Sequence, residues 1–338
     1  MIIDAREPSA HCQQSMRHST YSAQRGRTNK LDAKDVRIFC EMAFKNPKFN
    51  AFRDRHISPS GIGRSIGLDE KTVRVRVRKM EDEGFIKYYQ AVPSLALFGL
   101  RTVGSYRFEA LNHQTKQRVA EHIQHVPYVV EAFDYIGPHI SINIAGTSNE
   151  EVQTVADSIA ARYELSQMRL GDQDVTRAIM VPDKLDWQIM RNLRYNARTA
   201  TKDVAKALSI TPRMVEYRIR KLLSSGAMLI RAMIDPGKQQ GLIFYELEVT
   251  VQEEKESSLA KQLEKLHGEK LWLMRESRRG ILLANLFGFN LSEPEEAALN
   301  SLKMEGVSSC SLYILKEVIE PQGPNWIDSI MKEEVAES

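Results

Sequence analysis

A run of basic side chains past the middle of the chain has the spacing of a nucleic-acid contact surface. Arg213, Tyr217 and Arg220 recur three or four residues apart, so a helix places them on one side. Val215 and Ile219 fall on the opposite side and give that helix a buried stripe. Arginine and tyrosine donate hydrogen bonds to base edges and phosphates, so the exposed side predicts contact with nucleic acid. A solvated helix face is the alternative.

The residues around this run mark the ends of its helix and the helix before it. Thr211 can cap the first turn, Pro212 suits the first helical position, and Gly226 can close the far end. Upstream, residues 201–208 form a second amphipathic pattern, joined to the first by a short turn. The spacing therefore predicts a helix-turn-helix within residues 185–227.

The chain contains this pattern twice. A shift of 142 residues places Asp69 on Thr211 as capping residues and aligns apolar, small, basic and glycine positions. A repeat of this length indicates a duplicated domain. The aligned positions are Ile62, Gly63, Ile66, Leu68, Val73, Arg76, Arg78, Lys79, Met80 and Gly84, which fall on Val204, Ala205, Leu208, Ile210, Val215, Arg218, Arg220, Lys221, Leu222 and Gly226.

Composition limits the classes of protein to consider. The 338 residues are 42% hydrophobic and can bury more than one core. A net charge of +3 means that nucleic-acid affinity must come from local clusters of Lys and Arg. Cys12, Cys40 and Cys310 lack metal-ligand spacing and fit a reducing interior. No apolar run approaches the ~20 residues of a membrane span. We expect a cytoplasmic protein without a metal or other cofactor.

Both copies resemble the winged helix-turn-helix of the Lrp/AsnC family of transcription regulators. The likeness rests on LDAKD at residues 31–35, NARTA at 196–200, and the helix strings TVRVRVRKMEDEGFI at 72–86 and MVEYRIRKLLSSGAM at 214–228. The resemblance implies double-stranded DNA as the partner, read by the last helix of each copy. The implied DNA-binding residues are Lys71, Thr72, Arg74, Arg76, Arg78 and Lys79 in the first copy and Thr211, Arg213, Tyr217, Arg218, Arg220 and Lys221 in the second.

From residue 101 onward the pattern of apolar residues changes from helical to alternating. Strands are expected at 102–109, 128–136, 139–145 and 168–180, with helices at 113–125 and 150–163. Residues 243–319 repeat this order, with strands expected at 243–251, 271–276, 281–288 and 308–319 and helices at 257–267 and 293–303. The order βαββαβ is that of a ferredoxin-like fold, whose antiparallel sheet carries helices on one face only. An apolar open face needs a partner.

In Lrp/AsnC regulators such modules pair between two chains, so the resemblance implies an internal pseudo-dimer here. The predicted fold class is α+β, with two winged helix-turn-helix domains alternating with two ferredoxin-like domains. The two DNA-reading heads should contact half-sites about one helical turn apart, and their different helix strings predict an asymmetric operator. The expected segments are a flexible basic arm at 1–30, the two heads at 31–95 and 182–238, the ferredoxin-like domains at 96–181 and 239–320, and a tail at 321–338.

The resemblance also implies a small-molecule effector, such as an amino acid, and a homo-oligomer through the ferredoxin-like domains. The family's effector region is the turn between the central strands, which here falls in AFDYIGPHI and RESRRGILL. A basic turn suits an anionic ligand or a carboxylate, and a solvated hairpin tip is the alternative. The candidate effector-binding residues are Asp134, Tyr135, Arg275, Arg278 and Arg279.

Siroheme decarboxylases are similar to this family and are the enzymatic alternative. Those enzymes hold tetrapyrrole carboxylates with histidine and arginine on the central strands, and His139 and the Arg278-Arg279 pair lie near such positions. Their histidine-tyrosine-arginine string is missing. No Ser-His-Asp set, phosphate-cradling glycine loop or paired zinc-binding cysteines stands out. The sequence therefore favours a DNA-binding regulator with no catalytic residues, rather than an enzyme.

Overall fold

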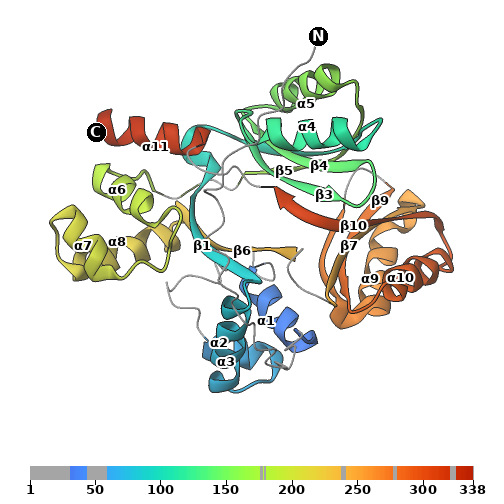
Figure 1. Ribbon diagram of the computed structural model, residues 1–338, viewed down its shortest axis with the longest axis horizontal. Helices are drawn as coiled ribbons and strands as arrows, with labels where there is room; N and C mark the ends of the chain where they lie inside the picture. The colour runs from blue at the N-terminus through green and yellow to red at the C-terminus, as the bar shows by residue number, and fades with distance from the viewer. Residues whose placement is uncertain are drawn as a thin grey trace, which may run out of the picture. The chain divides into compact units, whose positions relative to one another are not determined.

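The computed structural model describes residues 31–43, 59–175, 178, 180–236, 241–276, 280–319 and 325–337. The expected basic arm and the effector candidates Arg278 and Arg279 lie outside these residues. No helix within them is long and apolar enough to cross a membrane. The elements follow the predicted order, and the fold is α+β, with helix-turn-helix units and one large antiparallel sheet (Figure 1).

Each head consists of three helices followed by a strand. In the last helix of each head the predicted stripes are buried, because Val73, Val77 and Met80 point into the first core and Val215 and Ile219 into the second. The first head contains α1 (Ala33–Ala43), α2 (Pro59–Ile66), α3 (Glu70–Asp82) and β1 (Ile86–Pro93), and the second contains α6 (Lys184–Leu193), α7 (Thr201–Leu208), α8 (Pro212–Ser224) and β6 (Met228–Ile234).

The strands that leave the two heads pair with each other. Strands β1 and β6 form a two-stranded antiparallel sheet, with Tyr88 opposite Met233 through to Pro93 opposite Met228 and a shift in register between Ile86 and Tyr88. The Ala197 N–H of the second head also donates to the Tyr89 carbonyl of the first at 2.8 Å. Backbone hydrogen bonds therefore join the heads directly (Figure 1).

The two βαββαβ modules share one eight-stranded sheet in the order β5-β2-β4-β3-β10-β7-β9-β8. The modules meet where β3 pairs with β10. Strand β5 ends at Asp174, so the predicted strand at 168–180 is too long. The modules contain β2 (Thr102–Glu109), α4 (His113–Ile123), β3 (Val129–Tyr135), β4 (His139–Gly146), α5 (Asn149–Tyr163) and β5 (Ser166–Asp174), then β7 (Ile243–Val251), α9 (Glu256–His267), β8 (Leu271–Glu276), β9 (Ile281–Gly288), α10 (Ser292–Leu302) and β10 (Val307–Ile319).

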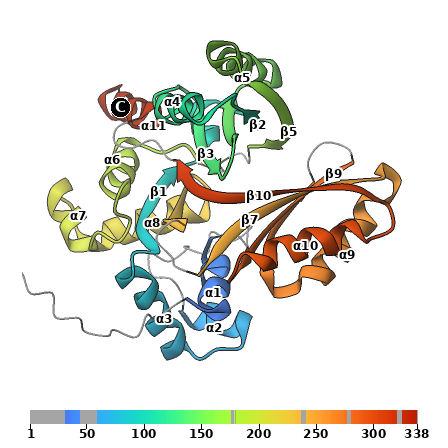
Figure 2. The same cartoon turned by 45° about the vertical axis from the view of Figure 1, so that its right-hand side comes forward.

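Each module covers one face of its sheet with its own two helices, α4 and α5 in the first and α9 and α10 in the second (Figure 2). Alternate strand residues such as Ile142 and Leu247 are fully buried beneath these helices. Burial of a branched aliphatic side chain contributes ~1.5–3 kcal/mol, so the two helix-covered cores account for much of the stability of the modules.

The helix-free faces differ from the expectation, because they carry buried charge. Arg107 of β2 donates to Glu246 and Glu248 of β7, and its guanidinium lies 3.6 Å from the centre of the Tyr313 ring. Burial alone lowers the pKa of Arg107, but the charges of the two carboxylates and nearby tyrosines raise it above its ordinary value. These faces therefore cover each other through ion pairs as well as apolar contacts.

The ion pair between Arg107 and Glu248 lies at the pseudo-two-fold axis. Asn143 and Asn285 are equivalent by the 142-residue repeat, and they lie opposite Ser105 of β2 and Glu246 of β7. Two residues further along these strands, Arg107 lies opposite Ser141 and Glu248 lies opposite Leu283. Arg107 and Glu248 thus occupy equivalent positions and contact each other. In a symmetric homodimer this contact would join two like charges, which is unfavourable in a buried site. A pair of opposite charges at this position requires two modules of different sequence, and a single chain that contains both modules meets this requirement.

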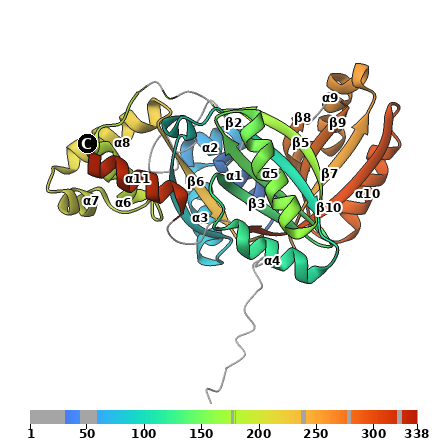
Figure 3. The ribbon, with the colours of Figure 1, turned by 90° about the horizontal axis from the view of Figure 1, so that it is seen from above.

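The C-terminal residues dock on the rest of the chain. Helix α11 (Trp326–Glu337) packs against α6 (Figure 3), and Asp328 accepts a hydrogen bond from the Tyr195 hydroxyl at 2.7 Å. The Trp326 indole N–H donates to the Val129 carbonyl at 3.0 Å. The tail therefore connects the second head to the first ferredoxin-like module.

Candidate nucleic-acid interface

Helix α8 presents a polar, cationic face to solvent. Arg213 and Arg220 are exposed, and Tyr217 between them keeps 57% of its surface exposed. Within the part of the chain that the structure describes, no carboxylate forms an ion pair with Arg213, Arg220 or Lys221. The side chains predicted to reach DNA are thus not neutralised by neighbouring acids.

The N-terminus of α8 is organised by its cap. The Thr211 hydroxyl accepts the Met214 N–H at 3.2 Å, and Pro212 occupies the first turn as predicted. The turn before it requires a left-handed residue, which is Ser209 at φ 56° in the second head and the equivalent Gly67 at φ 72° in the first. Both heads therefore use the same turn, although a left-handed serine costs ~1 kcal/mol or more.

Helix α3 presents the matching face in the first head, but most of its cations have partners. Val75, on the side opposite the buried stripe, is 62% exposed. Arg74 pairs with Glu70 at 2.6 Å, and Arg78 lies 3.8 Å from Asp82. Thr72 donates its hydroxyl to the helix cap, Asp69. The first head is therefore less cationic on its exposed face than the second.

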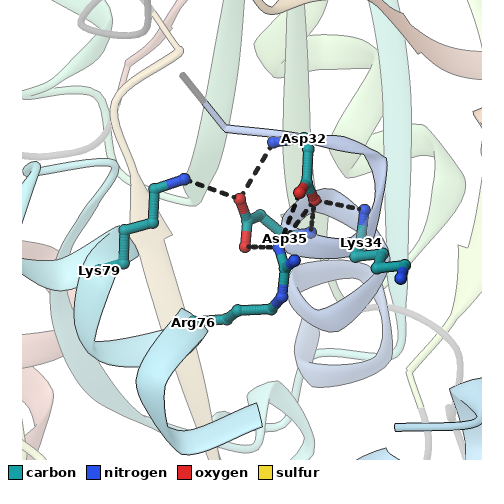
Figure 4. Close-up of polar contacts among 5 residues, drawn as sticks. All are labelled: Asp32, Lys34, Asp35, Arg76 and Lys79. Carbon is teal, nitrogen blue, oxygen red and sulfur yellow. Dashed lines mark hydrogen bonds and ion pairs between the residues drawn. The ribbon is translucent and has the colours of Figure 1, made fainter. Parts of the chain in front are cut away.

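Arg76 and Lys79 of α3 point away from the open face, toward the start of α1 (Figure 4). Arg76 donates to Asp32 at 2.8 Å and to the fully buried Asp35 at 2.7 Å, while Lys79 reaches Asp35 at 3.2 Å. Burial lowers the pKa of Arg76, but its bonds to Asp35 and Asp32 raise it overall. We name this cluster the first clamp, because it fixes α3 on α1.

The second head repeats the clamp with Arg218 in place of Arg76. Its guanidinium lies 2.7 Å from Asp183 and 2.8 Å from the buried Asp186. The hydrogen bond to Asp183 raises the pKa of Arg218. For Asp183, burial raises the pKa, but the bonds from Arg218 and the Asp186 N–H lower it overall. This second clamp also forms a capping box at the start of α6.

The clamps give three of the sequence-predicted DNA contacts an intramolecular role. Arg76, Lys79 and Arg218 hold the last helix of each head against its first helix. Sequence reasoning missed the carboxylates, although a signal was present: Asp183 and Asp186 lie 151 residues after Asp32 and Asp35.

The variants Arg218→Ala and Lys221→Ala should separate clamping from DNA contact. Arg218→Ala should lower the free energy of unfolding by ~1–3 kcal/mol, because buried Asp186 loses its partner. Lys221→Ala should change stability by less than ~0.5 kcal/mol, but should weaken binding to all DNA sequences and reduce the salt slope by about 1. Denaturant unfolding and DNA titrations measure both, and equal stability of the two variants would contradict the clamp.

The second clamp also predicts that the stability of the chain depends on pH. The pKa of Asp183 is lower in the folded chain than its ordinary value of 3.8, so the folded chain binds fewer protons than the unfolded chain near that pH. The stabilisation is complete above this range and is lost as the pH falls through the folded-state pKa. The stability difference between the parent and Arg218→Ala should therefore shrink below about pH 3.8.

The three effector candidates among the described residues, Asp134, Tyr135 and Arg275, do not form one site. Asp134 is buried and binds Lys116 at 2.5 Å and Lys316 at 2.7 Å. Tyr135, its neighbour on β3, points to the other face of the sheet and lines a cavity of about 130 Å³ together with Arg275. Tyr135 and Arg275 thus come together, while Asp134 lies apart from them.

Comparison with known domains agrees with this geometry. The model of the AsnC-type helix-turn-helix domain matches residues 183–223, and that of a winged helix-turn-helix DNA-binding domain matches residues 52–87. Both heads are winged helix-turn-helix units, and the second is of AsnC type. The predicted Lrp/AsnC resemblance is thereby confirmed. No curated protein matches the chain.

Solved structures extend the comparison to the whole chain. The siroheme decarboxylase NirDL is 13% identical, with a TM-score of 0.50 over 90% of this chain and 99% of its own. AsnC of E. coli is 18% identical, with a TM-score of 0.36 over 44% of this chain and 99% of its own. LrpC of B. subtilis is 16% identical, with a TM-score of 0.31 over 40% of this chain and 94% of its own.

The likeness to NirDL corrects one expectation from the sequence. We expected a regulator that is not an enzyme, because the histidine-tyrosine-arginine string of siroheme decarboxylases and other catalytic motifs are missing from the sequence. The enzyme NirDL shares this arrangement across 90% of the chain, with a TM-score of 0.50. The expectation of no enzymatic activity is therefore wrong as an inference from this architecture.

Proposed function

We propose that this chain is a cytoplasmic, sequence-specific DNA-binding transcription regulator whose two heads contact two different half-sites. The observation that supports this most is the exposed face of α8, where Arg213, Arg220 and Lys221 have no carboxylate partner among the described residues. A helix with unpaired cations and a capped N-terminus can lie in the major groove, where arginine reaches guanine and lysine reaches phosphate.

The two heads contribute unequally in this proposal. Helix α8 supplies most of the sequence discrimination, because its cations are free to meet base edges. Helix α3 contacts DNA mainly through Lys71, and through Arg74 and Arg78 after these exchange Glu70 and Asp82 for phosphate. Exposed ion pairs of this kind are worth only ~0–1 kcal/mol, so the exchange costs little.

Selection of fragments from a random DNA pool, followed by titration at several salt concentrations, tests the proposal. We expect one enriched asymmetric site and a log–log salt slope of about −4 to −6, given roughly five to seven phosphate contacts. If no fragment binds better than competitor DNA, the proposal fails. An effector bound at the ferredoxin-like modules is the second part of the proposal, and it predicts a ligand-dependent change in this affinity.

A second function, binding and decarboxylation of a tetrapyrrole, has a cavity in its favour besides the likeness to NirDL. A cavity of about 790 Å³ lies between α4, β10 and β1, and Lys87, Lys116, Lys316 and His113 line it. Its volume is within the range of sites for large ligands. His139 does not line it and makes an edge-to-face contact with Tyr313 instead.

Absorbance titration with an iron tetrapyrrole bearing carboxylate side chains tests this second function. A saturable shift of the absorbance band, lost in Lys316→Ala, followed by release of carbon dioxide, would support it. No spectral change with the folded parent chain would exclude it.

A further inference from the structure

The small cavity between the two modules contains hydrogen-bond donors that have no acceptor. Asn285 on β9 is only 9% exposed, and its side-chain Nδ2 has no hydrogen-bond partner within the described part of the chain. The buried Nε of Arg275 on β8 also has no hydrogen-bond partner among the described residues, and the Nη2 of this side chain lies 3.5 Å from the Glu246 carboxylate. Both side chains line the cavity of about 130 Å³. A buried donor without an acceptor costs ~1–3 kcal/mol, so the site is incomplete.

The repeat shows what completes the same position in the first module. Asn143, the equivalent of Asn285, accepts from the Ser105 hydroxyl at 2.6 Å and donates its Nδ2 to Glu131 at 3.1 Å. Glu131 lies opposite Asn143 across the β3–β4 pair. The residue opposite Asn285 across the β8–β9 pair is Leu273. The second module therefore keeps the donor and has lost the carboxylate that satisfies it.

The surroundings define what can replace that carboxylate. Phe133, Phe244, Trp272 and Leu315 supply an apolar lining. Two carboxylates also line the cavity, and both already have cationic partners: Glu131 binds Arg231, while Glu246 accepts from Arg107 and faces Arg275. An apolar cavity of ~150 Å³ accommodates benzene, which sets the size of the occupant.

We propose that this cavity binds a small carboxylate with an apolar body. The carboxylate oxygens accept hydrogen bonds from Asn285 Nδ2 and Arg275 Nε, and the apolar body packs against Phe133, Trp272 and Phe244. An arginine and an amide that converge on a mainly apolar cavity, whose own carboxylates are already paired, form a strong site for an anion of planar shape. The ligand thus takes the place that Glu131 occupies in the first module.

The cavity is also placed to affect the second head. Residues 231–234 of β6 line it, and β6 begins four residues after the end of α8. Arg231 binds Glu131 at 2.6 Å, which ties β6 to the first module. A bound carboxylate therefore touches the strand that connects α8 to the sheet. This regulatory consequence rests on the proposed DNA-binding function, whereas the binding site itself does not.

Calorimetric titration of the full-length chain with benzoate, and with benzyl alcohol as its neutral analogue, tests the site. We expect saturable binding of benzoate and at least about tenfold weaker binding of benzyl alcohol, because only the anion pairs with Arg275. Leu273→Glu should restore the acceptor of the first module and weaken benzoate about tenfold or more. Asn285→Leu and Arg275→Gln, each checked for folding by thermal unfolding, should do the same.

Two results would overturn the site: no benzoate binding to the folded parent at millimolar concentration, or equal affinity of the parent and all three variants. The same titration repeated with the selected DNA fragment tests regulation. If benzoate binds and leaves DNA affinity unchanged, coupling to the head is refuted while the site is supported. If benzoate binds and no DNA fragment is selected, the site is supported and the DNA-binding function fails.

Discussion

Replacing Arg213 with alanine should reduce the affinity for the selected DNA site by about 10- to 100-fold while leaving affinity for unrelated DNA nearly unchanged. The reason is that Arg213 lies in the first turn of α8, on its exposed face and without a carboxylate partner among the described residues. A bidentate arginine–guanine contact is worth ~1–3 kcal/mol of discrimination. Fluorescence anisotropy with specific and scrambled fragments measures both affinities.

Arg162→Ala is the matched control for Arg213→Ala. Arg162 is an exposed arginine of α5, in the first ferredoxin-like module, so its removal changes the net charge equally without touching a head. We expect it to leave the specific affinity within about twofold of the parent, since surface electrostatics far from the interface are screened by salt. An Arg213→Ala variant that keeps its sequence preference would show that α8 does not read bases.

Replacing Arg107 with methionine should lower the free energy of unfolding by ~3–5 kcal/mol, because it removes the buried cation that donates to both Glu246 and Glu248. Both carboxylates are about nine-tenths or more buried, and both accept from Arg107. Denaturant unfolding at neutral pH measures the loss.

The exchange of charges across the pseudo-axis provides the control for that prediction. Because Arg107 and Glu248 occupy equivalent positions, the double variant Arg107→Glu with Glu248→Arg re-forms an unlike pair with the order reversed. It should be more stable than either single variant, which places two like charges at the axis. If the double variant is no more stable than Arg107→Glu alone, the contact is not the determinant that we infer.

Local signals in the sequence were sufficient for most of the fold. Capping residues and apolar periodicity located α7 and α8, and alternation located β2, β7, β8 and β9 with the bounds that the structure has. Helix caps, helical periodicity and strand alternation each depend on residues that are close together in the sequence. The expectation of an apolar open sheet face was wrong. Arg107 and its carboxylate partners lie far apart in the sequence, and only the fold brings them together as a buried ion-paired set.

The candidate interface was predictable to the extent that it depends on helix periodicity. The buried and exposed sides of α3 and α8 followed from spacing alone. Spacing does not show which exposed cations have partners, since the acids that bind Arg76 and Arg218 come from the first helix of each head. The cavity at Asn285 was beyond prediction for the same reason, because its lining comes from both modules and β6.

The measurement that tests the central claim most directly is a titration of the selected DNA site against its two palindromic derivatives. Each derivative carries one half-site twice, in opposite orientations. If α3 and α8 read different half-sites, the parent chain binds the asymmetric site at least about tenfold more tightly than either palindrome, since each mismatched base pair costs ~1–3 kcal/mol. Equal binding to the asymmetric site and to a palindrome would contradict two distinct reading heads in one chain.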